Sequence, residues 1–136
     1  DRMCRISMGY QSRSDEADIV SRRACDSGDL ILVRAVLVTR GTRNHADVRV
    51  GSSVRGAIDL VEVATRLAVI RGVEVIDPEV GLDAALVALS GRIRLHEGGE
   101  TQPEDVIRDL WSQVLAAENP EPEREPEGDQ GKVGAP

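Results

Sequence analysis

An arginine in the first turn of a predicted helix is the strongest candidate for chemistry in this sequence. Gly51-Ser52-Ser53 precedes Arg55, and an apolar-rich segment then runs to Gly72. The free N–H groups and the dipole of a helix N-terminus favour anions, and an arginine there adds a planar, permanently charged set of donors suited to phosphate oxygens. From residue chemistry alone, the alternative of an exposed Arg55 that pairs with Asp59 is the more frequent arrangement.

Other reactive residue types lack the spacing that a site requires. The segment Gly128-Asp129-Gln130-Gly131-Lys132-Val133 is shorter than the phosphate-binding G-x-x-x-x-G-K-[ST] loop and lies in a polar tail. His45 and His96 fall in separate predicted loops, without a second ligand at metal spacing. No nucleophile has a neighbouring base, and capping explains the carboxylates at predicted helix starts. Arginines therefore remain the candidates for a site.

Composition restricts the fold and the partners. With 136 residues, 40% of them hydrophobic, the chain can form one domain whose core is built from Leu, Ile, Val and Ala, because Tyr10 and Trp111 are its only aromatic residues. The scarcity of aromatic residues and the net charge of −7 argue against nucleic acid as a partner. No apolar run approaches the roughly 18–20 residues of a membrane span. The unpatterned Cys4 and Cys25 and the lack of a visible signal peptide predict a reducing, cytoplasmic location.

The hydrophobic pattern predicts a mainly helical fold, a small bundle over residues 13–117. Residues 1–12 would carry one short strand, at Arg5–Tyr10, and residues 118–136 would form a disordered acidic tail rich in Pro, Glu and Gly. A lone strand has no partner here, and the chain begins at Asp1 without an initiator Met. Both observations lead us to expect a fragment of a longer protein.

Capping signals place the helices of the bundle. We expect helices from Ser14 to Arg23 or Cys25, from Asp29 to Gly41, from Ser52 or Ser53 to Gly72, from Asp77-Pro78 to Gly91, and from the capping box Thr101-Gln102-Pro103-Glu104 to Leu115. Residues 48–50 and 73–76 would be extended, and residues 92–95 would either extend a helix or form a strand. The apolar face of the second helix would comprise Leu30, Val33, Val36 and Leu37. The central helix would have two buried apolar stripes, one formed by Val54, Ile58, Val61 and Ala68 and the other by Leu60, Val63, Leu67 and Ile70. Its exposed polar face would carry Arg55, Asp59, Glu62 and Arg66. On that face, Glu62 would pair with Arg66.

Several stretches in this order resemble the lid region of MoxR-family AAA+ ATPases. Gly51-Ser52-Ser53-Val54-Arg55-Gly56-Ala57 resembles the motif G-[AS]-S-[PV]-R-[GA]-A, and residues 38–47 are similar to V-R-A-T-R-x-H-P-D. Residues 67–72 and 76–79 resemble L-A-x-x-x-G-R and V-T-P-[DE]-D. Residues 1–10 are similar to L-D-R-F-x-x-x-x-x-x-G-Y, which closes the ATPase core. The resemblance covers roughly residues 1–96.

The resemblance implies a helical lid over residues 13–117, preceded by the end of the ATPase core over residues 1–12. Arg55 matches the sensor-2 arginine, which reaches the ATP phosphates in its own subunit. Arg2 matches the arginine finger presented to the nucleotide of the adjacent subunit. The full-length protein would bind ATP and Mg²⁺, form a homo-oligomeric ring, expected to be a hexamer, and remodel or activate partner proteins.

The sequence also departs from the family pattern. Met3 replaces the usual Phe, Val73 follows Gly72 in place of Arg, and residues 26–39 are shorter than the family average. The chain has no Walker A loop, Walker B segment or sensor-1 asparagine, so it lacks the phosphate cradle and the Mg²⁺ ligands. We therefore expect this chain alone to bind no cofactor and to be inactive.

Two other classes of function compete with the ATPase lid. The first is a stand-alone helical interaction module with an acidic tail, which would bind protein and no nucleotide. The second is a nucleic-acid-binding helical domain, suggested by the three arginines between Val38 and Val50 but disfavoured by the acidic balance.

Overall fold

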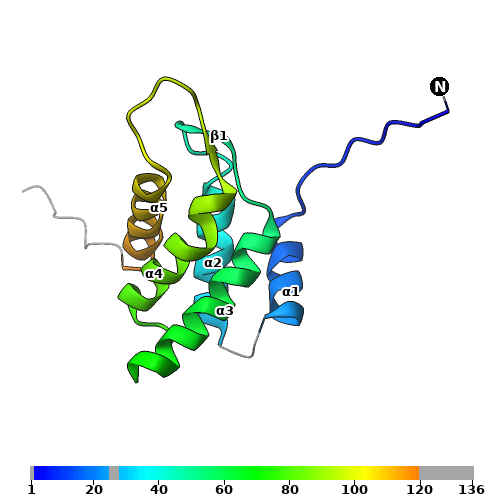
Figure 1. The fold of residues 1–136 in the computed structure, drawn as a ribbon. Helices are drawn as coiled ribbons and strands as arrows, with labels where there is room; N and C mark the ends of the chain where they lie inside the picture. Colours follow the sequence, from blue (N-terminus) through cyan, green and yellow to red (C-terminus); the bar gives the residue numbers. More distant parts are fainter. Residues whose placement is uncertain (1, 25–27, 120–136) are drawn as a thin grey trace, which may run out of the picture.

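The structure is a computed structural model that describes residues 2–24 and 28–119. Helices make up the body, as the composition predicts (Figure 1). In chain order the elements are α1 (Arg13–Arg23), α2 (Asp29–Gly41), β1 (Val48–Val50), α3 (Val54–Arg71), α4 (Pro78–Leu89), the 3₁₀ helix η1 (Ser90–Arg92), β2 (Arg94–Leu95) and α5 (Pro103–Glu118). Among these described residues, no helix is both long and apolar enough to cross a membrane.

Helices α2 and α3 lie at the centre of the bundle. Helix α1 packs against both of them on one side, and α4 and α5 cover the other side (Figure 1). Strands β1 and β2 form a small antiparallel sheet at one end, with Val48 opposite Leu95 and Val50 opposite Arg94. The sequence allows residues 92–95 to form either a helix or a strand, and in the structure Arg92 ends η1 while Arg94 and Leu95 form β2.

The core contains aliphatic side chains and one aromatic residue, Trp111, which is 2% exposed. Trp111 fits against α4 because Gly81 has no side chain there. A Cβ atom at Gly81 would lie only 2.3 Å from the indole ring. The aromatic-poor core predicted from composition is therefore confirmed, and its one large ring requires a glycine on the facing helix.

Capping residues in the sequence correctly predict the end of α3 and the start of α4. Helix α3 ends at Gly72, whose φ of 67° is left-handed, and the Val73 N–H closes the cap on the Ala68 carbonyl at 3.1 Å. Helix α4 begins with Pro78 in its first turn, and the Asp77 carboxylate accepts hydrogen bonds from the N–H groups of Glu79 and Val80. Both ends confirm the prediction.

Helices α1 and α5 have N-terminal caps that differ from the predicted ones. The N-cap of α1 is Ser12, which accepts a hydrogen bond from the Asp15 N–H at 3.2 Å, and not Ser14. The capping box of α5 consists of Gln102 and Asp105, one residue beyond the predicted pair. Residues 73–76 form a turn in place of the predicted extended link.

The predicted strand at Arg5–Tyr10 is wrong. Residues 2–11 have no regular secondary structure, and the segment leaves the helical body (Figure 1). Three apolar side chains of this segment, Met3, Ile6 and Met8, are 81–93% exposed. A strand needs a neighbouring edge with which to pair, and residues 2–11 pair with neither β1 nor β2.

Two predicted apolar faces also need correction. In α2, Leu30 and Val33 are exposed, and the buried side is formed by Ile31, Arg34, Ala35, Val36, Val38 and Thr39. In α3, Ile70 is 79% exposed and therefore lies outside the predicted buried stripe. The predicted ion pair between Glu62 and Arg66 is not formed within 4.0 Å.

Glu118 is the last residue of α5. Its carboxylate accepts hydrogen bonds from Arg34 Nε at 2.8 Å and Arg34 Nη2 at 2.7 Å, and Arg34 Nη1 donates to the Ile76 carbonyl at 2.8 Å. From residue 120 onward, the predicted tail lies outside the described residues. Hydrogen bonds from the buried Arg34 guanidinium hold the pKa of Glu118 below its usual value of about 4.5.

We expect this pair to make folding stability depend on pH. Since the folded state lowers the pKa of Glu118, the contribution is complete above pH 4.5 and is lost as the pH falls through the folded-state pKa. Glu118→Gln should lower the free energy of unfolding by about 2 kcal/mol at pH 7. Urea denaturation should show this difference shrinking at acid pH, whereas a difference that stays constant would contradict the prediction. Glu97→Gln, in an exposed turn, controls for the loss of one negative charge.

Candidate functional site

The start of α3 is held close to the end of α2 by short-range packing. A Cβ atom at Gly51 would lie 2.7 Å from the Arg43 backbone, so the two segments can approach this closely only with glycine there. The buried Ser52 donates its N–H to Thr42 Oγ1 at 2.9 Å, and Thr42 donates in turn to the Thr39 carbonyl at 2.6 Å. The first turn of α3 therefore starts from a fixed backbone.

Ser53 occupies the predicted N-cap position but does not close the helix end. Its φ and ψ of −76° and 174° are those of an N-cap, yet its hydroxyl accepts no hydrogen bond from the first turn. By contrast, Asp77 caps α4 with its carboxylate. The first-turn N–H groups of α3 thus lack a side-chain acceptor, which is the arrangement that suits an anion.

Gly56 allows α3 to pack tightly on α4. A Cβ atom at this position would lie 2.2 Å from Ser52 Oγ and 2.6 Å from Leu89 Cδ2. The residue after Arg55 therefore faces the interior, while the Arg55 side chain is 67% exposed. Burial of one position and exposure of the next direct the guanidinium to the surface of the bundle.

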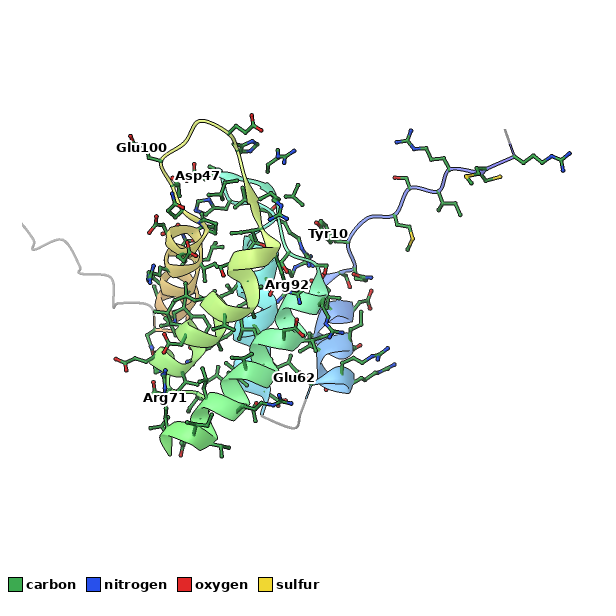
Figure 2. All side chains as sticks on the ribbon, in the orientation of Figure 1. Tyr10, Asp47, Glu62, Arg71, Arg92 and Glu100 are labelled. Atoms are coloured by element: carbon green, nitrogen blue, oxygen red, sulfur yellow. The ribbon has the colours of Figure 1, made fainter. Side chains whose placement is uncertain are left out.

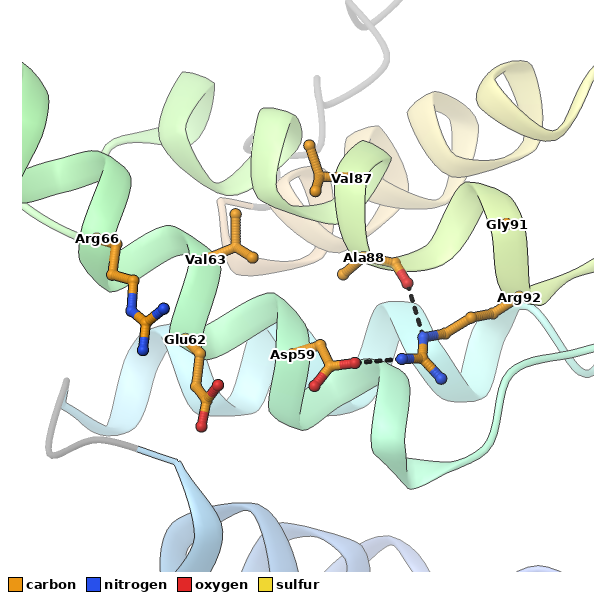
Figure 3. Close-up of a pocket in the computed structure, with 8 residues that line it drawn as sticks. All are labelled: Asp59, Glu62, Val63, Arg66, Val87, Ala88, Gly91 and Arg92. Carbon is orange, nitrogen blue, oxygen red and sulfur yellow. Dashed lines mark hydrogen bonds and ion pairs between the residues drawn. The ribbon is translucent and has the colours of Figure 1, made fainter.

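Arg55 pairs with Asp59, as its spacing on the helix predicts. Arg55 Nε lies 3.2 Å from Asp59 Oδ1. The other oxygen of Asp59 accepts a hydrogen bond from Arg92, whose Nε also donates to the Ala88 carbonyl at 3.0 Å (Figure 3). One carboxylate is therefore shared by two arginines that lie far apart in the sequence.

Two hollows flank α3, and Arg55 lines the first of them. The first, of about 440 Å³ between α1 and α3, is lined by Ile19, Arg23, Val54, Arg55, Ile58 and Glu62. The second, of about 570 Å³ between α3 and α4, is lined by Asp59, Glu62, Val63, Arg66, Val87, Ala88, Gly91 and Arg92 (Figure 3). Two arginines, Arg23 and Arg55, thus line the first hollow together with the carboxylate-bearing Glu62.

Sequence reasoning missed both Arg23 and Arg92 as neighbours of Arg55. Arg23 ends α1, and Arg92 lies in η1 after α4. Neither position carries a local signal, because its proximity to Arg55 results from helix packing. The sequence could only show that each is an arginine near a helix end.

Arg2 lies on the extended N-terminal segment and is exposed (Figure 1). No described ion pair or hydrogen bond joins it to Arg55 or to the rest of the bundle. Arg2 and Arg55 are therefore not brought together within this chain.

The histidines lie in loops, as predicted. His45 Nε2 is 3.3 Å from Asp109 Oδ2 on α5, and His96 is exposed after β2. In the part of the chain that the structure describes, no group of three or more His, Cys, Asp or Glu side chains is arranged to hold a metal ion.

Comparison with protein families identifies the central part of the bundle. The family model of the AAA lid domain matches residues 40–110, from the last turn of α2 to the middle of α5. Comparison with curated proteins and with solved structures found no match. The matched region spans more than half of the chain and includes Arg55, the Asp59–Arg92 pair and the end of α2. The chain therefore belongs to the AAA lid domain family, the helical lid of the AAA+ superfamily.

Proposed function

We propose that this chain is the lid of a MoxR-type AAA+ ATPase, in which Arg55 acts as the sensor-2 arginine. The observation that carries the proposal is the position of Arg55. It is an exposed guanidinium in the first turn of α3, beside N–H groups without a side-chain acceptor, within the region that matches the AAA lid domain. The MoxR assignment is supported by the resemblance of the motifs around Arg55 and at residues 38–47.

The shared carboxylate suggests how Arg55 could move between partners. Phosphoryl transfer requires fixed positive charge around the transferred phosphate, and a planar arginine supplies two parallel donors. Arg55 would exchange Asp59 for phosphate oxygens, while Arg92 keeps Asp59 paired. Because the released carboxylate still has a cation, the exchange leaves no unpaired buried charge.

Arg2 would serve as the arginine finger of a neighbouring subunit. Its extended segment reaches away from the bundle that carries Arg55, which suits a contact outside the same lid (Figure 1). ATP and Mg²⁺ would be bound by an AAA+ core joined to this lid. The complete protein would act in the cytoplasm as a homo-oligomeric ring, a hexamer in this proposal, that remodels or activates partner proteins.

A second candidate function is a protein-interaction module without nucleotide binding. Exposed apolar side chains favour it: Val69 and Ile70 at the end of α3 are 78% and 79% exposed, and Val87 on α4 is 69% exposed. Exposed apolar side chains can contribute to interaction surfaces when they lie together. In that case Arg55 would be dispensable, so the two functions make opposite predictions for its removal.

In a protein that joins this lid to its AAA+ core, we expect Arg55→Ala to lower kcat for ATP hydrolysis by roughly 10²-fold, the usual effect of removing one transition-state donor. The lid should remain folded, because an exposed ion pair contributes at most about 1 kcal/mol. Steady-state hydrolysis and urea denaturation check the two effects. Arg66→Ala, an exposed arginine on the same helix, is the matched control and should leave kcat unchanged. Equal turnover of the Arg55→Ala and unaltered proteins would support the interaction module instead.

Mixing two inactive variants tests the different roles of Arg2 and Arg55. We expect Arg2→Ala and Arg55→Ala rings to be inactive separately. In an equal mixture, about one quarter of the sites would combine an intact Arg55 in cis with an intact Arg2 from the neighbour, so activity should return after subunit exchange. If both arginines serve the same subunit, no mixed site is complete and the mixture should stay inactive. Hydrolysis before and after mixing distinguishes the two arrangements.

A further inference from the structure

Glu16 is a carboxylate whose burial the sequence did not predict. It lies in α1, its residue is 1% exposed, and it pairs with two arginines from the end of α2 and the loop after it. Glu16 Oε2 is 2.9 Å from Arg40 Nη1, and Glu16 Oε1 is 2.7 Å from Arg43 Nη2. A buried charge needs such partners, and here they come from a different helix and loop.

Both arginines also contact the N-terminal segment. Arg40 Nη1 donates a hydrogen bond to the Gln11 carbonyl at 2.9 Å. The Arg43 guanidinium carbon lies 3.9 Å from the centre of the Tyr10 ring, a cation–π distance. Tyr10 lies where the segment that carries Arg2 joins the helical body (Figure 2). The segment is therefore attached to the bundle through these two arginines.

Arg43 makes a further contact, with the segment that begins α3. Its Nε donates to the Ser52 carbonyl at 2.7 Å, and its side chain is 8% exposed. The Arg43 backbone also lies against Gly51. Arg55 lies only three residues after Ser52 in the sequence. A single side chain thus contacts Glu16, Tyr10 and the backbone immediately before the first turn of α3.

We propose that Glu16, Arg40 and Arg43 form a coupling cluster, which transmits the position of residues 10–11 to Arg55. The planar Arg43 guanidinium has one edge on Glu16, one face on Tyr10 and its Nε on Ser52, so displacement of the N-terminal segment changes the support of α3. The cluster consists of positioning residues, since none of them needs to touch the nucleotide. Its effect on hydrolysis rests on the proposed ATPase function, whereas the coupling itself is a property of this chain.

Hydrogen–deuterium exchange on the complete 136-residue chain, without nucleotide, tests the coupling. Tyr10→Ala removes the ring from an exposed position and leaves the core intact, and we expect exchange of the amides at residues 52–56 to rise roughly tenfold. Tyr10→Phe keeps the aromatic face and should leave exchange unchanged. Glu16→Gln should also raise exchange at residues 52–56, and Arg43→Lys, which keeps the charge but loses the Nε donor, provides a milder variant if Glu16→Gln does not fold.

Glu118→Gln is the matched control, because it breaks another partly buried arginine–carboxylate pair at a different place in the bundle. It should lower stability without selectively raising exchange at residues 52–56. Unchanged exchange at these residues in both Tyr10→Ala and Arg43→Lys would overturn the coupling. A general rise throughout the bundle, equal to that of Glu118→Gln, would also overturn it, since the cluster would then have only a structural role.

In the protein with its AAA+ core, Tyr10→Ala and Arg43→Lys should lower kcat several-fold with little change in KM, as expected when a transition-state contact is misplaced. Tyr10→Phe, which keeps the aromatic ring, should have the same kcat as the unaltered protein. Altered exchange with unchanged kcat would overturn the role of the cluster in hydrolysis. Failure of the ATPase function itself would be seen as an Arg55→Ala protein with unchanged turnover, and the exchange experiment would still decide the coupling.

Discussion

Burial of the Glu16 carboxylate is the constraint that orders the rest of the structure. A carboxylate removed from water must be matched by cations, and the cations at hand are Arg40 and Arg43. Because they lie at the end of α2 and in the following loop, their attraction to α1 sets how those elements meet. The pairing is geometrically demanding, since each arginine has further partners on other segments.

The same arrangement explains why the start of α3 is well defined without a side-chain cap. Thr42 accepts a hydrogen bond from the Ser52 N–H, Arg43 donates one to the Ser52 carbonyl, and Gly51 permits the backbones to touch. Tertiary contacts therefore replace the hydroxyl cap that Ser53 could have supplied. The first-turn N–H groups remain free of side chains, and the helix dipole at that end is unshielded by an acidic residue.

Around Arg55, electrostatics favour exchange of partners over a permanent bond. Asp59 is held on one side by Arg92 and on the other by Arg55, which is the more exposed arginine. The pair contributes little to folding because water screens it. Membership of the AAA lid domain family gives the proposed phosphate contact of this weakly held arginine a context.

The sequence by itself determined the helical class, the extent of α3 and α4, and the candidacy of Arg55. These features depend on local signals: the left-handed Gly72, the Asp77-Pro78 helix start and the four-residue spacing of Arg55 and Asp59. Only the tertiary structure decided which face of α2 is buried, that residues 5–10 form no strand, and that Arg92 shares Asp59. It also decided that Glu16, an ordinary first-turn acid in the sequence, is buried between two arginines. The physical reason is the separation in sequence between the interacting residues. Capping and helical spacing act within a few residues, whereas strand pairing, burial and charge neutralisation depend on partners that only folding brings together.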